Sequence, residues 1–91
     1  MTNLLSSDEQ VLINVAIRDM LQHSHYRRLV DVLRGDGEID DESVDQIAGS
    51  LQHWMREASR ATRHYFFTTE VREAAQEIAP VLRAVLQSRD A

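Results

Sequence analysis

The sequence predicts a small all-α protein, and three observations support that prediction. Apolar residues recur with helical spacing along almost the whole chain, and the period of two that marks strands is absent. Only one proline and three glycines interrupt the 91 residues. With 43% hydrophobic and 27% charged residues, the composition is that of an ordinary folded domain. We therefore expect a single helical domain over residues 1–91, built as an elongated antiparallel bundle of three to four helices, with fraying at 1–6 and 89–91.

The first helical arm is expected over residues 7–34. Its apolar residues form two stripes with helical spacing, the first ending at Leu21 and the second beginning at Tyr26. The two stripes are out of phase, so a single straight helix would not bury both of them. We therefore expect this arm to be kinked near residues 22–25, with Ser24 as the cap of its second half.

The second arm is expected over residues 41–66. Its apolar residues alternate at intervals of three and four, which is the pattern of a helix that buries one face. The core or dimer seam of this arm includes Leu51, Trp54, Ala58 and Tyr65. At 1.5 Å per residue such a helix would be about 39 Å long, which is why the sequence predicts an elongated bundle.

The third arm is expected over residues 69–88. The same spacing continues in Val71, Ala74, Ala75, Ile78, Val81, Leu82 and Val85. Pro80 lies inside this arm and removes one backbone donor, so we expect a kink there. Either Thr68 or Thr69 is expected to cap its start.

The corner between the first two arms is acidic and raises the question of a calcium site. Its carboxylates are Asp36, Glu38, Asp40, Asp41, Glu42 and Asp45. An EF-hand loop needs a first ligand and a glutamate at position 12, and with Gly37 at position 6 these places fall on Val32 and Ser43. The pattern instead favours a helix start with Asp40 as its N-cap, and binding of some other cation over 36–45 is left open.

The same corner resembles a motif of a known family. Asp36, Gly37 and Ile39 are similar to the D-G-x-I/V corner between helices in tellurite-resistance TerB-like domains. The acidic residue that ends that motif would fall at Ser43, next to Glu42. The resemblance covers only this short stretch, and it implies no function for the chain.

Two further patterns lie on the second arm. Arg56, Arg60 and Arg63 are spaced i, i+4, i+7, which is a stripe suited to phosphate contacts and equally to balancing the helix dipole. On a neighbouring face, the imidazoles and carboxylate of His53, Glu57 and His64 are candidate metal ligands. Nearby arginines would repel a metal ion, so a solvated face with a Glu–Arg pair is the alternative.

Composition excludes several functional classes. The chain has no cysteine, so thiolate metal sites, disulfides and cysteine nucleophiles are excluded. A net charge of −5 does not favour nonspecific nucleic-acid binding. No secretory signal and no apolar run long enough to span a membrane are present, so we expect a cytoplasmic protein. No glycine-rich phosphate loop, metalloprotease motif or nucleophile elbow suggests an enzyme or a cofactor.

These observations favour a small non-enzymatic interaction or regulatory module. Because the apolar seams exceed what one thin bundle would bury, we expect a homodimer or a monomer that docks on a protein partner. Arg63, Phe66 and Phe67 are the predicted partner contacts, since aromatic and arginine side chains dominate interface energetics. The alternatives are a nucleic-acid-binding regulator that uses the arginine stripe and a metal-binding bundle.

Overall fold

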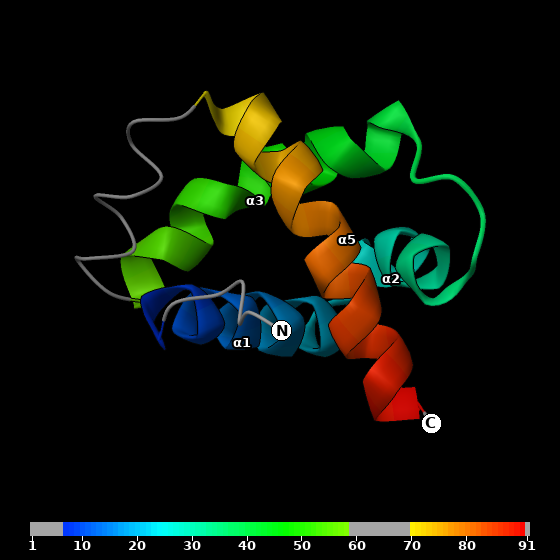
Figure 1. Ribbon diagram of the computed structural model, residues 1–91, viewed down its shortest axis with the longest axis horizontal. Helices are drawn as coiled ribbons and strands as arrows, with labels where there is room; N and C mark the ends of the chain where they lie inside the picture. The colour runs from blue at the N-terminus through cyan, green and yellow to red at the C-terminus, as the bar shows by residue number, and fades with distance from the viewer. Residues whose placement is uncertain (1–6, 59–69, 91) are drawn as a thin grey trace, which may run out of the picture.

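The computed structural model describes residues 7–58 and 70–90, and within these ranges the protein is all-α (Figure 1). The described residues contain four α-helices and one short 3-10 helix. In chain order they are α1 (Ser7–Gln22), the 3-10 helix η1 (Ser24–Tyr26), α2 (Arg27–Arg34), α3 (Asp41–Ala58) and α5 (Val71–Asp90). The predicted fold class, a small bundle of helices, is therefore confirmed.

The expected kink in the first arm is present. α1 ends at Gln22, the 3-10 helix follows His23, and α2 starts at Arg27. Ser24 does not cap the second half, because neither η1 nor α2 has a side-chain hydrogen bond at its N-cap. The break is closed by backbone bonds instead: the N–H of Tyr26 donates to the carbonyl of His23 over 3.1 Å.

The helices form a compact molecule and not the elongated bundle that we expected. α3 packs against both α1 and α5, and α2 packs mainly against α5. α1 and α3 run in opposite directions, whereas α5 crosses in front of them (Figure 1). The extents are 30 × 30 × 23 Å and the radius of gyration is 12.3 Å. The first arm is broken and α5 crosses its neighbours. The longest dimension, 30 Å, is therefore shorter than the helix of about 39 Å expected for the second arm.

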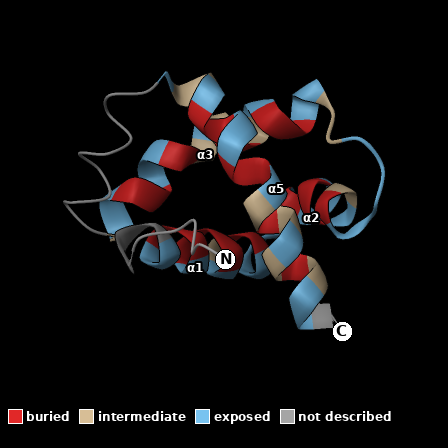
Figure 2. Ribbon diagram, viewed as in Figure 1, coloured by how far each residue is buried: buried red, intermediate tan, exposed pale blue. Residues whose placement is uncertain are grey.

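One hydrophobic core joins all of the described helices, and the buried positions face inward in Figure 2. Its largest fully buried apolar side chains are Trp54, Leu12, Ile17, Met20, Leu29, Leu33, Ile47, Leu51, Leu82 and Leu86. Burial of each such side chain stabilises the fold by about 1.5–3 kcal/mol. The helices therefore hold one another by burying the stripes that the sequence predicted.

The second-arm seam lies inside this core. Leu51 and Trp54 are fully buried, and Ala58 is half-buried against the core. Tyr65 lies outside the described residues, as does the predicted part of this arm beyond residue 58. Since the described seam is covered by the chain's own helices, it does not supply the surplus apolar surface on which the expected dimer was based.

The third arm differs from the prediction in its bounds. α5 begins at Val71, where the N–H of Ala74 donates to the carbonyl of Glu70 over 2.9 Å. The helix continues through Pro80 and reaches Asp90, beyond the expected end at residue 88. The expected caps at residues 68 and 69 lie outside the described residues.

Candidate functional site

Most of the predicted contact residues cannot be placed. Arg63, Phe66 and Phe67, the predicted partner contacts, lie outside the described residues. Two arginines of the predicted phosphate stripe, Arg60 and Arg63, lie there as well. The third, Arg56, is exposed on α3. The structure therefore neither brings the stripe together nor separates it.

The candidate metal ligands His53 and Glu57 contact each other. His53 Nε2 lies 2.8 Å from Glu57 Oε2, and an Arg18 terminal nitrogen lies 3.7 Å from the other oxygen of Glu57. His64 lies outside the described residues. Within 7–58 and 70–90, no three histidine, aspartate or glutamate side chains are grouped so that they could hold a metal ion.

The acidic corner starts α3 and is held by an arginine of α2. Asp40 is the predicted N-cap, since the N–H of Ser43 donates to Asp40 Oδ1 over 2.9 Å. Arg28 donates to the other carboxylate oxygen of Asp40 over 2.5 Å and also approaches Glu42 at 3.5 Å. The hydrogen bond from Arg28, together with those from Ser43, lowers the pKa of Asp40 far below its usual range.

A second arginine reaches the corner from α5. Arg72 forms ion pairs with Asp41, at 3.4 Å, and with Asp45. With Arg28 on the α2 side, two guanidinium groups thus engage four of the corner carboxylates. These contacts explain those four acidic residues as a helix start that is tied to two other helices, so calcium is not needed to account for the four.

The 3-10 turn at the start of α2 is attached to α3 by a polar cluster. Trp54 Nε1 donates to Asp19 Oδ2 over 2.7 Å, and the hydroxyls of Tyr26 and Ser50 share a hydrogen bond of 2.6 Å. Burial alone would raise the pKa of Asp19, but hydrogen bonding by Trp54 and Tyr26 lowers it overall. Burial raises the pKa of the Tyr26 phenol. Gln46 adds a hydrogen bond of 3.0 Å to the carbonyl of His25.

The C-terminal end of α2 is attached to α5. Arg83 donates to the carbonyls of Leu33 and Val32 over 3.1 and 2.8 Å. Gln87 donates to the carbonyls of Arg34 and Gly35 over 3.2 and 3.0 Å. The last carbonyls of a helix have no partner within the helix, so these two side chains act as its cap from a distance.

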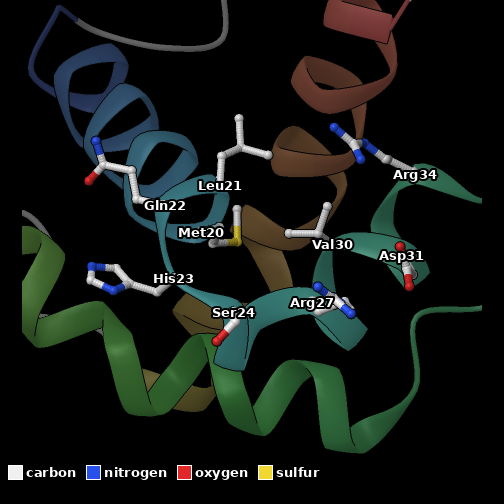
Figure 3. Close-up of a pocket in the computed structure, with 9 residues that line it drawn as sticks. All are labelled: Met20, Leu21, Gln22, His23, Ser24, Arg27, Val30, Asp31 and Arg34. Carbon is white, nitrogen blue, oxygen red and sulfur yellow. The ribbon is translucent and has the colours of Figure 1, made fainter.

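A groove lies where α1 and α2 meet, and we call it the corner groove (Figure 3). Its volume is about 420 Å³. Met20, Leu21 and Val30 gather near its middle, while Arg27 and Arg34 lie on α2 at either end. The apolar part has a buried floor, since Met20 and Val30 are only 2% and 6% exposed. Leu21 is 42% exposed and is therefore an accessible apolar side chain in the groove wall.

The sequence indicated the break that forms this groove but not the groove itself. Two residues of the stripe that ends at Leu21 are not buried, since Val11 and Leu21 are each 42% exposed. They lie at the two edges of that stripe, where the side chains of a helix with 3.6 residues per turn no longer point toward the core. Val11 and Leu21 each have a polar neighbour in the sequence, Gln10 and Gln22, and this polarity could have indicated that the edges of the stripe are exposed.

Comparison of the chain with protein families, with curated proteins and with solved structures yields no match. The resemblance at the acidic corner therefore depends on Asp36, Gly37 and Ile39 alone. Among the described helices, none has both the length and the apolar character that crossing a membrane requires.

Proposed function

We propose that the protein is a small non-enzymatic interaction module that binds a partner protein in the corner groove. The observation that carries this proposal is the half-exposed Leu21 above the buried floor of Met20 and Val30. A single exposed leucine is ordinary on a protein surface. Leu21 differs because it lines a hollow whose volume falls in the range of about 300–1,000 Å³ that suits a bound group.

The arrangement around the groove also suits a binding role. Its α2 wall is fixed at one end by the Tyr26–Ser50 bond and at the other by Arg83 and Gln87. A wall held at both ends is already in its binding shape, which reduces the ordering entropy lost on association. Residues Arg63, Phe66 and Phe67 remain the predicted contacts in the part of the chain that the structure does not describe.

The test is a selection of binding peptides from a random display library against the folded protein. If the groove is the site, selected peptides will shift the amide NMR signals of Leu21 and Val30. Leu21→Arg should abolish binding, whereas Val11→Arg should not, because Val11 is equally exposed on the same helix but does not line the groove. Failure to select any peptide, or equal binding to the two variants, would exclude the groove as a docking site.

Homodimer formation belongs to the same proposal, since the partner can be a second copy. Light scattering during gel filtration at two concentrations measures the solution mass against the 10.4 kDa chain. A dimer that Leu21→Arg converts to monomer would place the groove in the interface. A dimer unaffected by that substitution would place the interface elsewhere.

Nucleic-acid binding is the second candidate, and the exposure of Arg56 favours it. Arg56 is exposed on α3, and no ion pair engages it among the described residues. Binding of this kind weakens steeply with salt because neutralised phosphates release counterions. Excess absorbance at 260 nm in the gel-filtration peak, removed by Arg56→Gln, would favour nucleic acid over a protein partner.

A further inference from the structure

The segment that joins α2 to α3 contains the sequence Asp36-Gly37, and both residues are exposed. Residues 35–40 belong to no helix, so the backbone there is not fixed by a helical pattern of hydrogen bonds. Among the described residues, no hydrogen bond engages the backbone N–H of Gly37. The side-chain carboxyl of Asp36 is therefore followed by a main-chain nitrogen that is accessible and that no described residue engages.

Glycine at position 37 leaves this nitrogen open to the carboxyl of the preceding residue. A glycine has no Cβ, so neither a side chain nor a restricted backbone opposes a close approach to its nitrogen. A Cβ built at Gly37 would meet nothing within 4 Å, which means that the surroundings of this residue are open as well. An aspartate carboxyl and the next backbone nitrogen close into a cyclic imide when they can approach each other, and this site permits that approach.

The other aspartates of the described residues lack these conditions. All except Asp40 lie within helices, where the backbone is fixed and the next residue carries a side chain. Asp40 lies before α3, but both of its carboxylate oxygens accept hydrogen bonds, from Arg28 and from the backbone N–H of Ser43. Only Oδ1 of Asp36 accepts a hydrogen bond among the described residues. Asp36 is thus the aspartate whose carboxyl is best placed to react.

We propose that Asp36 is a site of spontaneous isomerisation to isoaspartate, in which the backbone nitrogen of Gly37 attacks the side-chain carboxyl. The new bond joins this nitrogen to Cγ of Asp36, and the bond between Cγ and one carboxyl oxygen breaks. That oxygen leaves as water, with the amide hydrogen and one proton from the solvent. The reaction needs no enzyme and no oxidant, so the chain itself and water supply all of the reactants.

Water then opens the cyclic imide in one of two ways. Cleavage between the Gly37 nitrogen and Cγ restores aspartate. Cleavage between that nitrogen and the main-chain carbonyl carbon of Asp36 gives isoaspartate, in which the main chain runs through Cβ and Cγ and the carboxylate is attached to Cα. The chain gains one backbone carbon at this position, and its covalent structure is changed without a change in mass.

Isomerisation also alters a contact between this segment and α5. Gln87 donates to Asp36 Oδ1 over 3.0 Å and to the carbonyls of Arg34 and Gly35 at the end of α2. In isoaspartate the carboxylate has moved to Cα and the main chain is longer, so the contact between residue 36 and Gln87 is lost. The connection of α2 to α5 is therefore weaker in the isomerised protein.

The experiment incubates the full folded chain at neutral pH in water labelled with heavy oxygen. Each opening of the imide places one heavy oxygen atom at the residue that formed it. Trypsin cleaves after arginine and releases residues 35–56 as one peptide, and electron-transfer fragmentation then locates the label and the isoaspartate. We expect both to accumulate at Asp36, whereas Asp40 in the same peptide stays unlabelled.

Two alanine substitutions test which nitrogen reacts. Gly37→Ala should slow the labelling of Asp36 severalfold, because a Cβ crowds the attacking nitrogen and restricts its backbone. This variant should fold, since the added Cβ meets nothing within 4 Å and the backbone of Gly37 does not have a positive φ. Gly35→Ala is the matched control: its Cβ comes no closer than 3.6 Å to another atom and the attacking nitrogen is unchanged, so labelling should keep the wild-type rate.

Three results would overturn the proposal in whole or in part. Label at Asp36 no greater than at Asp40 would overturn it, and this comparison within the wild-type peptide does not depend on any variant. Equal labelling rates in Gly37→Ala and the wild type would exclude attack by the Gly37 nitrogen. If the isomerised protein, separated by chromatography, showed wild-type hydrogen exchange at the end of α2, the loss of the Gln87 contact would be wrong.

Discussion

At the residue scale, the buried polar contacts are few and specific. The indole N–H of Trp54 is completely buried with its ring, and its partner Asp19 retains only 14% side-chain exposure. Such a pair stabilises the fold modestly when it is complete. Removing one partner destabilises the fold more strongly, because the other partner is then left buried without a hydrogen bond.

We predict that Asp19→Ala lowers the free energy of unfolding by about 1–3 kcal/mol, since it leaves the indole N–H of Trp54 unsatisfied. Urea denaturation followed by far-UV circular dichroism measures this change. Glu77→Ala is the control: Glu77 is exposed on α5, so the change there should stay within about 0.5 kcal/mol. Equal effects of the two substitutions would contradict a role for the Asp19–Trp54 bond.

The lowered pKa of Asp40 leads to a prediction of how the free energy of unfolding depends on pH. Its pKa is lowered by the hydrogen bond from Arg28 and by those from Ser43, so the folded protein binds this proton less readily than the unfolded chain. The stabilisation is complete above the ordinary aspartate pKa of 3.8 and is lost as the pH falls below it. Between pH 5 and pH 2, unfolding free energies of Asp40→Asn and Arg28→Gln should therefore fall less steeply than those of the wild type. An unchanged acid slope in both variants would be inconsistent with this coupling.

Of these contacts, the sequence predicted those between neighbouring residues but not those between residues far apart in the chain. The Asp40 cap was predicted, because a helix start is encoded by neighbouring residues. The Asp19–Trp54 pair was not, because its members lie 35 positions apart and no local pattern connects them. The arginines that engage the acidic corner were missed for the same reason, since Arg28 and Arg72 come from other helices.

At the element scale, α2 is the helix that depends most on its neighbours. It has only eight residues, and isolated helices of that length are unstable in water. Its first turn follows the 3-10 segment attached to α3, and its last carbonyls are capped from α5. The shape of the corner groove therefore depends on contacts made on the other side of α2.

We predict that Arg83→Leu destabilises the protein by about 1.5–3 kcal/mol, because it removes a charged donor to the carbonyls of Leu33 and Val32. Hydrogen exchange should also accelerate at the amides near the end of α2. Arg89→Leu, an exposed position on the same helix, is the matched control and should leave both measurements near wild-type values. If exchange in α2 were unaffected by Arg83→Leu, the distant cap would not be needed.

α3 contains a glycine that its packing does not require. An added Cβ at Gly49 would meet nothing within 4 Å, and the residue is exposed in the helix interior. Gly49→Ala should therefore raise the free energy of unfolding by about 1 kcal/mol, because alanine has the better helix propensity. Thermal and urea unfolding measure the gain. A loss of stability would show that the surface at Gly49 contacts something that the described residues do not include.

At the scale of the whole molecule, all described helices share one core. We expect cooperative unfolding in a single step, so that Trp54 fluorescence, which reports on the core, and circular dichroism, which reports on helices, give coincident urea transitions. Separate midpoints would mean that part of the bundle unfolds independently.

The overall shape of the molecule could not be predicted from the spacing of apolar residues in the sequence. The apolar spacing identified each helix and the break in the first arm, because both are properties of neighbouring residues. It did not give the crossing of α5 over α3, which depends on how side chains of different helices fit together. The predicted elongated shape was therefore wrong. The apolar spacing also did not predict that Leu21, on which the candidate site depends, is half-exposed.

The attachment of α2 at both ends has a consequence for how this protein can change during evolution. The groups that hold α2 are Tyr26 at its start and the side chains of Arg83 and Gln87 at its end. Arg27 and Asp31, on its outer surface, take no part in these bonds and lie beside the groove. If the corner groove binds a partner as proposed, substitutions at these two positions would alter which ligands are accepted while the scaffold is retained, so related proteins with different partners would differ here first.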